Sequence, residues 1–537
     1  MTRFAFVLAA TLTVPAAAVA QHEQHAAAAQ LGTVSFQTSC APSVAADVNR
    51  AVALLHSFEF RDALATFNTV LEKEPTCAIA HWGVALCHWG NPFAGIKSGP
   101  PLDRGAAAAQ RGLALTKATA RERAYIAAAA ELFTNAGTVP HRDRTIAYAR
   151  AMEGVQRNYP DDVEARIFYA LALNQTAAAT DKTYAVQLQA AAILEPLWTK
   201  HPDHPGLPHY IIHAYDHAPL AAKALDAARR YAKIAPSAPH ALHMPSHTFT
   251  RVGLWEDSAA TNIASERTAL DQNVIAEALH AMDYQIYAYL QLARDKAALA
   301  VLQRTPATAA KLDVNAVGGA APGVAGVYAT AAIAARYALE RGAWADAAAI
   351  KASSSPFPQA DAVTHFARAL GAARSGNAAA ATSDVEQLAA LRDRLAALKD
   401  EYWREQVDIQ RRVAVAWTTF ASGRRDEGIA LLREAADAED ATDKSAISPG
   451  PLAPARELLG EMLLEAGSAK EALVAFEATM AKEPGRFRGV YGAARAAEAS
   501  GDRARARQLY QSLLTIAKAA ETERPEVQRA RTFLKTP

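Results

Sequence analysis

The chain has 537 residues, of which 51% are hydrophobic, 7% aromatic and 21% charged. Few aromatic side chains among many alanines favour small, closely packed helices over a large mixed α/β core. The formal net charge is +1, so no overall electrostatic field attracts nucleic acid, and nucleic acid is not an expected partner.

Residues 1–20 have the features of an export signal. Arg3 supplies a positive start, an apolar stretch follows to Val14, and Ala18-Val19-Ala20 gives the small-x-small cleavage pattern. The apolar stretch is too short for the alternative, a membrane anchor, and no later stretch is long enough. We therefore expect cleavage after Ala20 and a periplasmic or secreted protein without a transmembrane segment.

Export makes disulfides possible, and the chain has three cysteines, Cys40, Cys77 and Cys87. Cys40 precedes the first expected helix pair, and Cys77 begins the helix after it. A Cys40–Cys77 bridge would pin the N-terminal segment to the helices, and Cys87 would be a buried, unpaired thiol. Three free thiols are the alternative.

Helical patterning continues through almost the whole chain, and no segment is a convincing strand. Several segments repeat a small residue, a bulky residue four positions later and a proline that ends the second helix of a pair. The clearest case is the series Gly467, Ala472, Phe476 and Pro484, which Gly501, Ala506 and Tyr510 follow at a spacing of 34 residues.

This pattern resembles the tetratricopeptide repeat superfamily over roughly residues 44 to 530. The resemblance implies an all-α, right-handed α-solenoid of about ten degenerate helix pairs, with a concave groove that binds a protein or peptide. The strings that start at Ala78 and Ala238 also resemble exported bacterial proteins of this superfamily, most of them without an assigned function.

The expected organisation has five parts. A partly disordered N-terminal segment (21–43) follows the signal, and an N-terminal array covers residues 44–304. A break over residues 305–325, rich in Gly, Ala and Pro, leads to a C-terminal array over residues 326–537. Further loops interrupt the helices at residues 89–105 and 441–454.

Two histidine pairs carry the strongest chemical signal. His209 and His213 are four residues apart, as are His243 and His247, so each pair shares one helix face. The two pairs are offset by 34 residues, one repeat length. Stacked repeats would bring the four imidazoles together on the groove wall, where they could bind one divalent Zn, Cu, Fe or Ni ion of unknown identity.

The same repeat register points further side chains towards this site. Possible additional ligands are His217, His240, His280 and Asp283. Pro245 lies between His243 and His247, so the helix is either kinked there or begins at Pro245. Groove recognition without a metal and a purely structural network remain alternatives.

The favoured function is an exported binding or scaffold protein with a histidine-lined metal site. One alternative is a metal-dependent hydrolase or another metalloenzyme on the same solenoid, and another is a metal-free peptide interaction module. The segment from His209 to His213 lacks the glutamate of the HExxH motif, which disfavours a zincin protease. No catalytic residues are assigned, and a non-enzymatic role is favoured.

Overall fold

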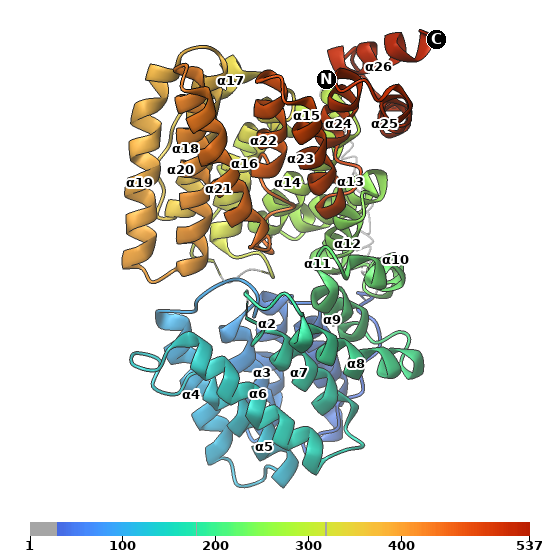
Figure 1. The fold of residues 1–537 in the computed structure, drawn as a ribbon. Coiled ribbons are helices and arrows are strands. Elements are labelled where there is room, and N and C mark those ends of the chain that lie inside the picture. The colour runs from blue at the N-terminus through green and yellow to red at the C-terminus, as the bar shows by residue number, and fades with distance from the viewer. Residues whose placement is uncertain (1–28, 179, 317–318, 537) are drawn as a thin grey trace, which may run out of the picture.

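A computed structural model describes residues 29–178, 180–316 and 319–536 of the chain, and these contain helices and loops but no β-strand. Each helix packs mainly against its neighbours in sequence (Figure 1). The expected all-α solenoid of helix pairs is confirmed. In the described ranges, no helix combines the length and apolar character needed to cross a membrane. The expected signal, residues 1–20, lies outside the described residues.

The helices form three successive groups. The N-terminal group contains η1 (Pro42–Val44), α1 (Ala45–His56), α2 (Phe60–Lys73), α3 (Ala78–Trp89), α4 (Pro100–Ala114), α5 (Ala120–Glu131), α6 (His141–Asn158), α7 (Val163–Asn174), α8 (Ala185–Lys200) and α9 (Gly206–Tyr215). The middle group contains η2 (Ala221–Ala224), α10 (Leu225–Ile234), α11 (Pro239–His243), α12 (Pro245–Arg251), α13 (Trp255–Asp271), α14 (Ile275–Gln291) and α15 (Asp295–Ala309). The C-terminal group contains α16 (Gly323–Leu339), α17 (Trp344–Ala348), α18 (Pro358–Arg374), η3 (Ala378–Ala381), α19 (Thr382–Ala397), α20 (Glu401–Ala421), α21 (Arg425–Asp440), α22 (Ala455–Glu465), α23 (Ala469–Lys482), α24 (Phe487–Ala499), α25 (Arg503–Ile516) and α26 (Pro525–Lys535).

Small residues allow the paired helices to approach closely. A Cβ atom added to Gly83 of α3 would lie 2.2 Å from the ring of Phe67 on α2. The same distance separates a Cβ on Gly492 of α24 from the ring of Phe476 on α23. The alternation of small and bulky residues in the sequence therefore packs one aromatic ring of one helix against bare backbone of the next.

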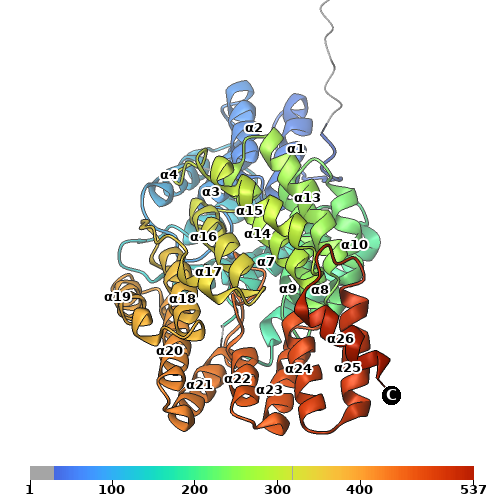
Figure 2. The ribbon, with the colours of Figure 1, turned by 90° about the horizontal axis from the view of Figure 1, so that it is seen from above.

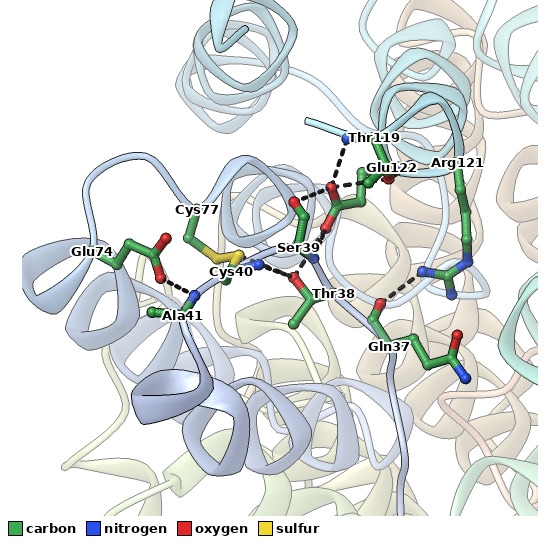
Figure 3. Close-up of a disulfide and its surroundings, with 10 residues drawn as sticks. All are labelled: Gln37, Thr38, Ser39, Cys40, Ala41, Glu74, Cys77, Thr119, Arg121 and Glu122. Carbon is green, nitrogen blue, oxygen red and sulfur yellow. Dashed lines mark hydrogen bonds between the residues drawn. A yellow bond between two sulfur atoms is a disulfide. The ribbon is translucent and has the colours of Figure 1, made fainter. Parts of the chain in front are cut away.

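The N-terminal segment is fixed to the first helices (Figure 3). Cys40 and Cys77 form a disulfide, and Cys87 is a buried free thiol. Beside the disulfide, the carboxylate of Glu122 on α5 accepts hydrogen bonds from the backbone N–H (2.7 Å) and the hydroxyl (2.6 Å) of Ser39. From residue 29 onward the segment expected to be partly disordered packs on the helices and buries Leu31, Val34 and Phe36; residues 21–28 lie outside the described ranges.

The C-terminal helices curve back onto the middle group (Figure 2). The indole N–H of Trp255 on α13 donates to the carbonyl of Gly485 at 2.8 Å, and the N–H of Phe487 donates to the side chain of Gln291 on α14 at 2.9 Å. The backbone N–H of Glu521 bonds the carbonyl of Ala293 at 3.2 Å. These contacts close the array on itself, so the C-terminal group covers part of the middle group.

A fully buried arginine lies at this closure. The guanidinium of Arg486 forms ion pairs with Glu457 of α22 and with Glu340 after α16, each with a nitrogen–oxygen distance of 2.8 Å. It also donates to the hydroxyl of Tyr287 on α14 at 2.9 Å. One charged side chain therefore connects three helices that are distant in sequence.

Candidate metal centre

Six histidines meet between the N-terminal and middle groups. Helix α9 contributes His209 and His213, α11 contributes His240 and His243, α12 contributes His247, and α14 contributes His280. None of them is more than 8% exposed. The sequence predicts that histidines line an open groove wall, and the structure corrects this, because these side chains are buried inside the molecule.

The six side chains form two trios. In each, one ring nitrogen per histidine lies within 4.8 Å of the other two: His209, His213 and His240 form the first trio, and His243, His247 and His280 form the second. The Nε2 atoms of His209 and His213 are 3.1 Å apart, as are those of His243 and His247. Each predicted pair thus converges, and a third histidine joins it.

The trios also touch one another. The ring centroids of His213 and His247 are 6.2 Å apart, and those of His240 and His243 are 5.9 Å apart. The predicted convergence of residues 209, 213, 243 and 247 is therefore a single buried cluster made of two adjoining trios.

Pro245 divides the helix without separating its histidines. Helix α11 ends at His243 and α12 begins at Pro245, but the intervening Met244 keeps right-handed helical angles (φ −52°, ψ −36°). The hydroxyl of Ser246 donates to the carbonyl of His243 at 2.7 Å, which satisfies an acceptor near the break. Both sequence interpretations thus hold in part, because α12 begins at Pro245 and the four-residue spacing still brings the two rings together.

Hydrogen bonds determine which ring nitrogen carries the proton in three of the six histidines. The Nδ1 atom of His209 lies 2.6 Å from the carbonyl of His56, and that of His243 lies 2.7 Å from the amide oxygen of Asn262. The Nδ1 atom of His247 lies 2.8 Å from a carboxylate oxygen of Asp216. Carbonyl and carboxylate oxygens only accept, so each Nδ1 carries a hydrogen and each neutral ring has a lone pair on Nε2.

The second trio therefore has two lone pairs facing each other across 3.1 Å, on Nε2 of His243 and His247. The hydroxyl of Tyr284 lies 3.4 Å from Nε2 of His247, but it has one proton and also lies 3.2 Å from the carbonyl of Ser448. Among the described residues no other donor reaches this pair. Facing lone pairs repel unless a cation lies between them, and histidines held in this way by outer acceptors are typical metal ligands.

The third histidine of each trio has at least one ring nitrogen without a hydrogen-bond partner among the described residues. Both ring nitrogens of His240 and Nδ1 of His280 are buried without a partner, as is Oε2 of Glu277. That oxygen lies 3.9 Å from Nδ1 of His240. Buried polar atoms of this kind are rare in folded proteins, and their concentration here fits the donor set of a transition metal.

A small cavity of about 20 Å³ lies among the trios. His213 and His240 of the first trio line it, together with His247 and His280 of the second and with Met244. This volume holds one water-sized occupant.

Three loops cover the cavity, one from each part of the chain. Asn91 follows α3, Ala320 precedes α16, and Ile447 lies between α21 and α22. The amide of Asn91 donates to the carbonyl of Ala320 at 3.0 Å, which ties two of the loops together. The segments that interrupt the repeat pattern in the sequence thus lie over the histidine cluster.

Burial favours the neutral form of five imidazoles of the cluster. It lowers the pKa of His209, His213 and His243 well below the usual value of histidine, and neighbouring histidines lower it further. Burial and the charge of Lys444 lower the pKa of His247 to about 4, and burial lowers that of His280 to about 3. Neutral imidazole is the form that binds metals.

A charged carboxylate lies behind each trio. Burial alone would raise the pKa of Asp216, but Lys444, Arg251 and His247 outweigh it and hold the pKa well below its usual range. Burial would likewise raise the pKa of Glu277, and the interactions with His240 and His280 lower it instead.

Two of the possible additional ligands lie outside both trios. Nδ1 of His217 is 3.5 Å from a carboxylate oxygen of Asp443, and the His217 ring packs on Tyr184. Asp283 accepts a hydrogen bond at 2.8 Å from Arg336, and both side chains are fully buried. The other two, His240 and His280, complete the trios.

A third group of close ligand atoms consists of His56, Glu164 and His204. In this group every histidine ring nitrogen already has a hydrogen-bond partner. Glu164 accepts from Nε2 of His56 at 2.8 Å and from Nε2 of His204 at 3.0 Å. The remaining nitrogen of His56 meets the hydroxyl of Tyr210 at 2.9 Å, and that of His204 accepts from the N–H of Gly206 at 3.2 Å. Neither imidazole of this group therefore has a free lone pair for a metal.

Comparison with known proteins does not assign the cluster. No protein-family model matches the chain, and no curated protein matches it. One similar solved structure is the crystal structure of the P58(IPK) TPR domain, with 14% sequence identity and a TM-score of 0.21 over 70% of this chain and 98% of that chain. A likeness this weak carries no argument about function.

Proposed function

We propose that this chain is an exported helical-repeat scaffold protein that binds a first-row transition metal in its buried histidine cluster. The observation that carries the proposal is the pair of Nε2 lone pairs of His243 and His247, which face each other at 3.1 Å while Asn262 and Asp216 hold the protons on the opposite nitrogens. A metal ion removes the repulsion between the two lone pairs. Neutral imidazoles without cysteine suit Zn, Cu, Ni or Fe.

Export and partner binding are part of the same proposal. The signal-like residues 1–20 support export. The stacked helix pairs support a role in holding a protein or peptide partner, because solenoids present long continuous surfaces. In this proposal the metal stabilises the place where the three helix groups meet.

Metal uptake by purified protein tests the proposal. Protein beginning at Gln21 is stripped with a chelator, loaded with Zn²⁺ at pH 7, dialysed and analysed for metal, with calorimetric titration in parallel. We expect retained zinc in the wild type and none in the double variant His213→Ala/His247→Ala, because each trio then loses a ligand. Helical circular dichroism should be unchanged.

The matched control is His365→Ala. His365 lies on α18 and bonds Asp384 at 2.7 Å, away from the cluster. This variant should bind zinc like the wild type. Equal uptake by the double variant, or no uptake by the wild type of any of Zn²⁺, Cu²⁺, Ni²⁺ and Fe²⁺, contradicts the proposal.

A further inference from the structure

The division of the six histidines into two trios indicates how many metal ions the cluster can bind. Each trio has its own pair of Nε2 atoms 3.1 Å apart and its own third histidine. Three imidazoles at this spacing complete the protein ligands of an open tetrahedral site, which leaves one position for a further ligand. A single ion would use one trio and leave the other with uncompensated buried nitrogens.

The cavity lies where two open positions would meet. It is lined by His213 and His240 from one trio and by His247 and His280 from the other. Its volume of about 20 Å³ admits one water-sized ligand. Ring contacts between the trios place both sites next to this space. Two metal ions that share a ligand lie about 3.5–4 Å apart in proteins, a spacing compatible with adjoining trios.

A carboxylate lies near a histidine of each trio. Oε2 of Glu277 lies 3.9 Å from His240 of the first trio, and Oδ2 of Asp216 lies 2.8 Å from His247 of the second. Asp216 also pairs with Arg251 and Lys444, so its negative charge is shared. Asp216 orients its histidine ligand through the hydrogen bond to Nδ1 of His247. Glu277 has no such cation pair among the described residues, so its charge can offset part of the charge of an ion in the first trio.

From this arrangement we infer that the cluster binds a pair of transition-metal ions, one in each trio, with a small ligand between them. The inference rests on the proposed metal-binding function and specifies its stoichiometry. It also explains why six histidines gather where a single four-coordinate site needs no more than four.

Stoichiometry decides between one ion and two. Chelator-stripped protein titrated with Zn²⁺ at pH 7 should retain about two equivalents after dialysis. His240→Leu removes a ligand from the first trio and His280→Leu removes one from the second. Both ring nitrogens of His240 and Nδ1 of His280 have no hydrogen-bond partner among the described residues. Each variant should retain about one equivalent, half of the wild-type value, and the double variant none.

Loading with Cu²⁺ tests the shared ligand without relying on the variants. Two bridged Cu²⁺ ions couple magnetically, so fully loaded wild type should give a much weaker electron paramagnetic resonance signal per copper than protein with one ion. His240→Leu and His280→Leu should each restore the full signal of an isolated ion. If a variant fails to fold, the signal of the wild type at half and full loading answers the same question.

The outcomes separate the two proposals. One equivalent of metal in the wild type overturns the two-ion inference but leaves the proposed metal-binding function standing. No uptake overturns both. Two equivalents with two full, uncoupled copper signals would show that the ions are separate and would overturn the shared ligand. His365→Leu, outside the cluster, should behave like the wild type in every arm.

Discussion

At the scale of single side chains, the metal proposal depends on which ring nitrogen of each histidine carries the proton. Asn262 holds the proton of His243 on Nδ1, and its own orientation is fixed because its amide nitrogen donates to the carbonyl of Ser258 at 2.7 Å. Asn262 therefore keeps Nε2 of His243 free as a ligand.

Removing this acceptor should weaken the metal site. We expect Asn262→Leu to lower metal affinity by about 10–100-fold, because the ring of His243 can then adopt the wrong tautomer or turn away. Calorimetric titration with Zn²⁺ measures the change. Asn262→Asp keeps an acceptor at the same place and should retain most of the affinity. Equal losses in the two variants would show that the tautomer is not what matters.

The hydrogen-bonded group of His56, Glu164 and His204 should contribute to stability and not to metal binding. Glu164→Gln should lower the free energy of unfolding by about 3 kcal/mol at pH 7, because the charged partner of His56 and His204 is lost inside the protein. Metal content should not change. Urea unfolding and metal analysis of the same preparations check both statements, and a loss of metal would assign this group to the site.

The effect of Glu164 has a defined pH dependence. Burial by itself raises the pKa of Glu164, but His204 and His56 outweigh burial and hold the pKa below the usual value of 4.5. A carboxyl group whose pKa is lower in the folded protein stabilises it above the unfolded pKa and loses this effect as pH falls through the folded pKa. The difference between wild type and Glu164→Gln should thus be full at pH 6–7 and shrink as pH falls below about 4.5.

The sequence was enough to predict the histidines of the cluster, but not every residue that holds their protons in place. The four-residue and 34-residue spacings identified both histidine pairs, and the repeat register added His240 and His280. Nothing in the sequence marked Asn262, because its role depends on how α13 packs against α11. The contact of His204 with Glu164 joins segments 40 residues apart, which local spacing does not reveal.

At the scale of elements, the disulfide holds the N-terminal segment against α3 (Figure 3). The bridge closes a sequence separation of 37 residues. Glu122 of α5 holds the same segment through Ser39 and also caps its own helix together with Thr119. The first turn of the array thus has a covalent and a polar attachment side by side.

Removing the bridge should destabilise the protein. We expect Cys40→Ser to lower the free energy of unfolding by about 3–4 kcal/mol, because the unfolded chain loses a constraint of this length. Denaturation with and without a reductant measures the effect. Cys87→Ala is the control, because it keeps the bridge and should respond to reductant like the wild type. If reductant left the wild type unchanged, the bridge would contribute nothing.

The sequence predicted the approximate positions of the loops that interrupt the repeat pattern, but it did not predict that they meet over the histidine cluster. Loops were expected at residues 89–105, 305–325 and 441–454, but α4 already begins at Pro100 and α15 continues past Pro306 to Ala309. A proline within a helix removes one hydrogen bond, which the packing of α15 against α14 and α16 outweighs. That all three loops meet over the histidines depends on the closure of the whole array, which has no local sequence signal.

At the scale of the whole molecule, the array is closed by contacts between its middle and its C-terminal end. Repeat arrays in general are held together by contacts between neighbouring repeats. Here Arg486 adds a long-range connection, since its buried guanidinium meets Glu457, Glu340 and Tyr287 at once. Closure also fixes the loop around Ile447 over the cavity, so the stability of the C-terminal helices and the enclosure of the histidines depend on each other.

Loss of the contacts made by Arg486 should destabilise the folded protein. We expect Arg486→Met to lower the free energy of unfolding by about 3–5 kcal/mol, because Glu340 then remains buried without an ion-pair partner and Glu457 keeps only the guanidinium of Arg488 at 3.7 Å. The control is Arg505→Met, whose partner Glu477 and own side chain are 42% and 39% exposed, so the loss should be below about 1 kcal/mol. Urea denaturation of both variants measures the difference. Equal stability of the two variants would mean that apolar packing alone closes the array. Zinc retention by Arg486→Met should also fall, because a loosened C-terminal group no longer covers the cluster.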